Sequence, residues 1–146
     1  MATFRGRYLN VLDHKGRLNI PSKFRRALSP DAQNTFVIIR GLDGCISLYP
    51  LDEWVKIEAK LRSLPVSKEN SRKFQRIMHL DSADATLDSQ GRIALPPALV
   101  KQAKISKDVV VFGILDRIEL WNPKLFEQYF ARSGQSYEET AEDLLF

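Results

Sequence analysis

The 146-residue sequence has one cysteine and two histidines, too few for several kinds of protein. Cys45 alone cannot form an internal disulfide, and a single thiol is typical of a reducing cytoplasm. Three such residues also leave no basis for a structural zinc site, so no metal is predicted. No apolar run reaches the roughly 18 residues of a membrane span, and the N-terminus lacks the apolar stretch of a signal peptide. We therefore expect a cytoplasmic protein that does not associate with membranes.

Motifs typical of enzymes are missing too. The sequence has no Gly-rich phosphate loop ending in Lys-Ser/Thr, no Gly-x-Ser-x-Gly elbow and no His-Glu-x-x-His. His79 stands near Asp81 and Asp84, but no further ligands complete a metal site there. We predict a protein that is not an enzyme, with no cofactor and no small-molecule substrate.

Basic residues are concentrated in the N-terminal half. Residues 1–73 contain 14 Lys/Arg and 7 Asp/Glu, whereas residues 74–146 contain 8 and 11, within a net charge of +4. The excess predicts a polyanionic partner, although a solvated basic face has the same composition. Residues 133–146 contain four acidic residues and no basic one, which predicts an acidic, partly mobile tail.

The chain contains an internal repeat. Asp13–Pro21 returns 75 positions later as Asp88–Pro96, with the same Asp, Gly, Arg and Pro and with matching apolar positions. After a three-residue shift the match continues, from Gly41 and Gly113 onward. A repeat of about 55 residues is too short to bury a stable core alone, so the two copies must share one. The predicted fold class is mixed α+β and mainly β, a pseudo-twofold β-barrel with helices outside.

A four-residue turn separates the first two strands of each repeat. Asp13-His14-Lys15-Gly16 joins Tyr8–Leu12 to Arg17–Ile20, with Asp able to accept backbone hydrogen bonds and Gly able to adopt positive φ. This predicts a tight hairpin with Lys15 at its tip. The structural turn residues of the two repeats are Asp13, Gly16, Asp88 and Gly91.

The arginine after each turn has two compatible interpretations. Alternation along the strand points Arg17 away from the buried face, and Arg92 holds the same place in the second repeat. Each could form a salt bridge with the aspartate of its own turn. Alternatively, a two-stranded ribbon could present both guanidinium groups to the DNA major groove, where arginine bonds guanine. Lys15 and Arg5 would then contact phosphates.

The second half of each repeat is predicted to be a hairpin followed by a helix. In the first repeat, Phe36–Arg40 and Cys45–Tyr49 precede an amphipathic helix at Leu51–Leu64, and Cys45 is a core residue. In the second, Asn122 is the expected N-cap of a helix that buries Phe126 and Phe130. A linker helix with an apolar stripe is expected within residues 65–82.

These motifs resemble the MraZ family of bacterial transcriptional regulators over about Phe4 to Arg132. The resemblance rests on Phe4-Arg5-Gly6, on Leu12-Asp13-x-Lys15-Gly16-Arg17-Leu18-x-Ile20-Pro21, on Leu48-Tyr49-Pro50, and on Asp88-x-x-Gly91-Arg92-x-x-x-Pro96. It implies two SpoVT–AbrB-type modules of the swapped-hairpin type, at residues 7–54 (with a helix to about 64) and 83–126, forming a pseudo-dimeric barrel.

The resemblance also implies a function. Members form ring-shaped homo-oligomers, associate with the nucleoid, and bind short direct repeats upstream of their own cell-division and cell-wall operon, usually as repressors. The DNA-contacting positions of the family fall on Lys15, Arg17 and Arg92. Gln90 stands where the first motif has Lys15, which puts equal DNA contact by the second turn in doubt.

A different class of function stays open beside this one. An antitoxin-like or scaffold protein could use the same basic face to bind an acidic partner protein. Antitoxins of this type usually carry one such module and a disordered toxin-binding tail, whereas this chain carries two modules and a short tail. The main prediction is a sequence-specific DNA-binding regulator.

Overall fold

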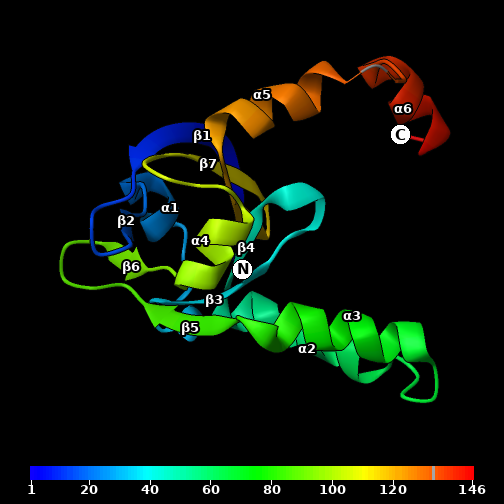
Figure 1. The fold of residues 1–146 in the computed structure, drawn as a ribbon, viewed down its shortest axis with the longest axis horizontal. Coiled ribbons are helices and arrows are strands. Elements are labelled where there is room, and N and C mark those ends of the chain that lie inside the picture. The colour runs from blue at the N-terminus through cyan, green and yellow to red at the C-terminus, as the bar shows by residue number, and fades with distance from the viewer. Residues whose placement is uncertain (133) are drawn as a thin grey trace.

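The strands form two separate sheets in the computed structural model, which describes residues 1–132 and 134–146 (Figure 1). The larger sheet is antiparallel, with six strands in the order β1-β7-β8-β4-β3-β5, and the smaller pairs β2 with β6. The strands are β1 (Phe4–Val11), β2 (Arg17–Asn19), β3 (Thr35–Arg40), β4 (Ile46–Pro50), β5 (Ala83–Thr86), β6 (Arg92–Ala94), β7 (Asp108–Leu115) and β8 (Arg117–Trp121). The helices are α1 (Ser22–Arg26), α2 (Leu51–Arg62), α3 (Glu69–Leu80), α4 (Pro97–Gln102), α5 (Pro123–Ala131) and α6 (Tyr137–Asp143), with 3₁₀ turns η1 (Pro30–Ala32) and η2 (Leu42–Gly44).

The two repeats exchange strands. β1 of the first repeat pairs along its whole length with β7 of the second, and β3 pairs with β5. β2 likewise pairs with β6. The predicted hairpin of β1 with β2 is therefore wrong, although the turn between them forms. Pairing across the repeats joins two small apolar faces into one core, which neither repeat could enclose alone.

A closed barrel is not confirmed. β1 and β5 are the edges of the six-stranded sheet, and neither has a second ladder in the described part of the chain. The β2–β6 ribbon lies beside both edges, since β2 contacts β1 and β6 contacts β5. The turns that enter the ribbon are closed by backbone bonds from Asp13 N to Arg17 O and from Asp88 N to Arg92 O, 2.9 Å each, and Asn10 Nδ2 of β1 donates to Asn19 O of β2 (2.7 Å).

The core lies between the large sheet and the β2–β6 ribbon. Phe4, Phe24 and Phe36 are at most 1% exposed and pack with Leu18 and Ile93 from the inner face of the ribbon. The outer face of the sheet is covered in two places. Trp54 and Leu61 of α2 pack on β3, and Phe126 of α5 packs on Cys45, Val110 and Trp121. The predicted core role of Cys45 is confirmed.

Two helical arms extend from the sheet, one made of α2 and α3 and the other of α5 and α6 (Figure 1). The Asn122 cap is confirmed, because its Oδ1 accepts from Lys124 N (2.8 Å) and Leu125 N (3.1 Å). The burial of Phe130 is wrong, since this residue is 60% exposed and stands one turn of α5 beyond the buried Phe126. No helix in the described residues is long and apolar enough to cross a membrane.

The acidic tail, predicted as partly mobile from Ser133 onward, contains a helix. Ser133 itself lies outside the described residues, and α6 begins after Ser136. A capping box stabilises that start: the hydroxyl of Ser136 accepts from Glu139 N, and the Glu139 carboxylate accepts from Ser136 N.

Candidate nucleic-acid interface

The turn before β2 is closed by a single aspartate. Asp13 Oδ1 accepts from Lys15 N (2.9 Å) and from Arg17 N (2.8 Å), while Oδ2 accepts from Arg17 Nε (2.8 Å). Gly16 has φ of +76°, a conformation that strains other residues, and its amide donates to Asp13 O. One carboxylate thus fixes the backbone of the turn and the guanidinium that follows it.

The turn before β6 repeats this geometry. Asp88 Oδ1 accepts from Gln90 N and Arg92 N, and Oδ2 accepts from Arg92 Nε, each at 2.9 Å. Gly91 has φ of +77°, within a degree of Gly16. The internal repeat of the sequence is therefore also a repeat of local structure, and the ion pairs offered as one interpretation are present in both turns.

These hydrogen bonds keep both aspartates ionised. The bond from the Arg17 amide, together with those from the Arg17 guanidinium and the Lys15 amide, lowers the pKa of Asp13 from 3.8 to about 2. The Arg92 amide and guanidinium lower the pKa of Asp88 in the same way. Each arginine consequently has a negative partner at any pH near neutrality.

The two arginines lie on the outer face of one ribbon. In the β2–β6 register Arg17 faces Ala94 and Asn19 faces Arg92, while Leu18 faces Ile93 toward the core. Arg17 and Arg92 are therefore diagonal neighbours, with Cα atoms about 7–8 Å apart by sheet geometry. The ribbon is tied across the repeats by bonds from Ile20 N to Gly91 O and from Leu95 N to Gly16 O, 2.9 Å each.

The salt bridges leave part of each guanidinium free. Arg17 and Arg92 use only Nε toward their aspartates, and their side chains are 30% and 27% exposed. Within the described residues, their Nη atoms have no hydrogen-bond partner. The aspartates therefore orient both guanidinium groups, and each Nη pair can donate to an outside acceptor. The two interpretations of these residues are compatible.

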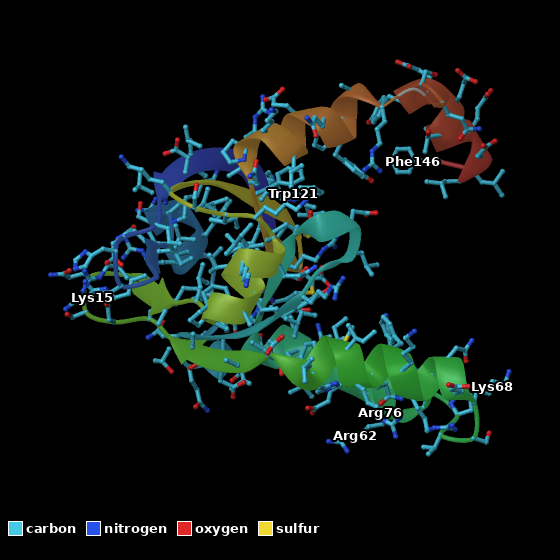
Figure 2. All side chains as sticks on the ribbon, viewed as in Figure 1. Lys15, Arg62, Lys68, Arg76, Trp121 and Phe146 are labelled. Carbon is cyan, nitrogen blue, oxygen red and sulfur yellow. The ribbon has the colours of Figure 1, made fainter. Side chains whose placement is uncertain are left out.

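Lys15 lies at the far end of the molecule. It is exposed at the tip of the first turn, at one extreme of the long axis (Figure 2). Gln90, at the corresponding place of the second turn, is exposed but carries no charge. The structure therefore brings Lys15, Arg17 and Arg92 together at one end.

Arg5 lies elsewhere. It is near the start of β1, six residues before Val11, which corresponds to about 20 Å of extended strand. Its neighbours around a shallow hollow are Lys23 and Arg26 of α1. These three basic residues form a second basic group, here called the flanking group; the sequence predicted a phosphate contact for Arg5 and assigned no role to Lys23 and Arg26.

Arg25 was not assigned by the sequence, yet it lies against the second turn. Its Nε donates to Ile20 O (2.9 Å), and a Cβ added to Gly91 would stand 2.6 Å from its Cζ. Seventy-five positions later the sequence has Val100, so the first turn receives no matching charge. The second turn, which has Gln90 in place of a lysine, thus has the guanidinium of Arg25 from the first repeat beside it. The only sequence signal was that Arg25 falls outside the apolar stripe of α1.

The other candidates from the sequence do not form a site. His79 Nδ1 donates to Gln75 O (2.7 Å), an ordinary contact within one turn of α3. No group of three or more potential metal ligands occurs among the described residues.

Fold and surface together define a two-repeat β-ribbon protein with a basic face. The family described as "MraZ protein, putative antitoxin-like" matches this chain twice, at residues 3–77 and 78–146. Two curated relatives, each a "Transcriptional regulator MraZ" from a strain of Lactobacillus delbrueckii subsp. bulgaricus, are 45% identical over 141 residues, covering 97% of this chain and 96% of their own length. The chain belongs to the MraZ family, a family of transcriptional regulators and not of enzymes.

Proposed function

We propose that the protein is a sequence-specific DNA-binding regulator that reads short direct repeats with the β2–β6 ribbon. The observation that carries this proposal is the pair of identical turns, in which an aspartate holds the Nε of an arginine and leaves its Nη atoms unpaired. A two-stranded ribbon fits the major groove of B-DNA, and an arginine can bond O6 and N7 of one guanine.

The basic residues divide into two roles. Arg17 and Arg92 read bases, because they are oriented and share one face. Lys15 at the tip of the first turn and Arg25 beside the second contact phosphates, so both turns engage the backbone despite Gln90. The flanking group of Arg5, Lys23 and Arg26 contacts phosphates further along the duplex. Phosphate contacts fix the register, and base contacts supply specificity.

Affinity for such sites has to come from several subunits. One ribbon covers only a few base pairs, so binding by a single chain is weak and linked contacts are needed. A homo-oligomeric ring of chains, each with modules at residues 7–54 and 83–126, would present like ribbons in the same sense to successive direct repeats. We place this regulator in the cytoplasm at the nucleoid, repressing the operon that encodes it, which holds cell-division and cell-wall genes.

The experiment begins with footprinting on the DNA upstream of the protein's own operon. Arg17→Ala and Arg92→Ala are then titrated against the footprinted site and against a scrambled duplex of equal length. Each should cost roughly 1–3 kcal/mol on the specific site and little on the scrambled one. Lys124→Ala, an exposed cation on α5, is the matched control and should leave the ratio of the two affinities unchanged. Wild-type discrimination by both arginine variants would overturn the base-reading role.

The acidic-partner function is the second candidate, and the surplus of basic groups around the ribbon is what favours it. The DNA affinity of the arginine variants distinguishes the two functions. A protein-binding face would show no footprint and no discrimination between the two duplexes, and Arg17→Ala would then leave DNA affinity unchanged at every salt concentration.

A further inference from the structure

The C-terminal segment carries apolar side chains that are almost fully in solvent. Tyr137, Leu145 and Phe146 are 85%, 94% and 104% exposed in the described structure. Helix α6, which begins this segment, has four acidic residues and no basic one: Glu138, Glu139, Glu142 and Asp143. A short helix that combines apolar and acidic groups at the end of an arm is typical of a segment that docks on another surface.

A groove of complementary character lies along α3. It has a volume of about 410 Å³, with Ile39 and Tyr49 of the sheet as its floor and Phe74, Ile77 and Met78 of α3 as one wall. Phe74 and Ile77 are 41% and 40% exposed, and no residue of α3 is fully buried. The apolar stripe of this helix is therefore only partly used by the fold of its own chain.

The lining of this groove contains charges of both signs, Arg40 and Arg117 with Asp43 and Glu119, whereas the exposed side of α3 next to it is basic. Lys73 and Arg76 are exposed on α3, beside the wall residues, and Arg40 is exposed at the rim. Lys68 and Arg76 lie at the opposite end of the long axis from Lys15 (Figure 2). This basic surface is thus separate from the ribbon proposed to read DNA.

We propose that α6 and the last residues of one chain dock in the α3 groove of a second copy. The apolar end, including Phe146, enters the groove, while the acidic residues of α6 face Lys73 and Arg76. The two arms leave the sheet separately (Figure 1), so each chain can offer its groove to one neighbour and its tail to another. Such a head-to-tail contact generates a ring when the rotation closes. The inference rests on the oligomer in the proposed function and assigns the surfaces that build it.

Site-directed cross-linking tests the contact directly. A chain with Phe146→Cys is mixed with a differently tagged chain with Phe74→Cys and oxidised, and Cys45 is 0% exposed and so stays out of the reaction. We expect a covalent pair that contains both tags. Val11→Cys, an exposed position next to the first turn, replaces Phe74→Cys as the control and should give no such pair. Linkage no greater than in this control would overturn the proposal. So would an internal link in a chain that carries both cysteines, because the tail would then dock on its own groove.

Charge reversal tests the same contact without cysteines. Lys73→Glu with Arg76→Glu, or Glu142→Lys with Asp143→Lys, should each weaken self-association by about tenfold or more in sedimentation without DNA. Combining the two pairs in one chain should restore association, which a folding defect would not do. Reversal at Lys73 and Arg76 that weakens DNA binding and leaves association unchanged would overturn the docking, because the surface would then be a second polyanion site.

Failure of this inference can be told apart from failure of the proposed function. Variants that dissociate should still bind a single repeat through Arg17 and Arg92, with the low affinity of one chain. A wild-type chain that sediments as a monomer at every concentration would overturn the docking and the ring but not the reading of bases. Intact assembly without sequence-specific binding would overturn the proposed function alone.

Discussion

Arg25 and Gly91 belong to different repeats, and the guanidinium of the first packs on the backbone of the second. A Cβ at position 91 would stand 2.6 Å from Arg25 Cζ, whereas a Cβ at Gly16 would meet nothing closer than Leu95 O at 3.8 Å. The two turns are alike in backbone and unlike in what lies against them. Substitutions at Gly16 and Gly91 can therefore be compared, because only the second affects the contact with Arg25.

Replacing the two glycines should separate the cost of backbone strain at positive φ from the loss of the Arg25 contact. Gly16→Ala and Gly91→Ala both force a side chain into positive φ, so each should lower the free energy of unfolding by about 1–2 kcal/mol. Only Gly91→Ala must also displace Arg25, and only it should weaken binding through the second turn. Urea unfolding and gel-shift titration of both variants measure the two effects. Equal losses of DNA affinity would show that the displaced guanidinium has no part in binding.

Arg25 should behave as the counterpart of Lys15. Arg25→Ala and Lys15→Ala should each reduce the slope of log affinity against log salt by about one unit, on specific and scrambled DNA alike. Gln90→Ala removes no charge and should leave the slope unchanged. Binding measured from low to moderate salt decides the matter. A change for Lys15→Ala but none for Arg25→Ala would leave the second turn without a phosphate contact.

The hydrogen bonds of Asp13 should make stability depend on acid pH. The folded pKa of about 2 is below the unpartnered value of 3.8, so the stabilisation is complete above pH 4 and is lost as the pH falls toward 2. Asp13→Asn keeps an oxygen for the backbone amides but cannot titrate. Its Tm should therefore fall less steeply than that of the wild type between pH 4 and 2, and the two curves should run parallel from pH 5 to 8.

Asp31→Asn is the matched control for this titration. Asp31 is exposed in η1 and has no salt bridge among the described residues, so Asp31→Asn tests whether the loss of a surface carboxylate alone changes the Tm curve. If the Tm curves of the wild type and of Asp13→Asn coincide below pH 4, the carboxylate of Asp13 does not stabilise the turn.

The local features of the fold could be predicted from the residues themselves, whereas the exchange of strands between the repeats was implied only by the resemblance to swapped-hairpin modules. The Asp-x-x-Gly turns are fixed by residues within five positions of each other, and so is the Asn122 cap. Alternation shows that Leu18 faces the core, yet it says nothing about which strand lies beside β2. The β2–β6 pair joins residues about 75 positions apart, and equivalent strands in two similar repeats have equivalent patterns.

The same limit applies to the candidate site. Arg17 and Arg92 were found because the repeat marks them, whereas Arg25 has no counterpart in the second repeat and touches the site only through the exchange of strands. Phe130 was misplaced for a related reason. A helical apolar stripe predicts a face, but where the sheet beneath α5 ends depends on tertiary structure.

The spacing of the DNA repeats should follow the helical turn of B-DNA. Subunits that present like ribbons in one sense must find their sites on one face of the duplex, about 10–10.5 bp apart. Inserting five base pairs between two repeats turns the second site to the opposite face and should remove most of the gain from linked binding, while inserting ten should restore part of it. Gel-shift titrations on one, two and three repeats with these spacers measure the effect, and a scrambled second repeat at natural spacing is the control. Undiminished binding to one isolated repeat, or indifference to the five-base insertion, would contradict linked binding by several subunits and leave the contacts of a single ribbon unaffected.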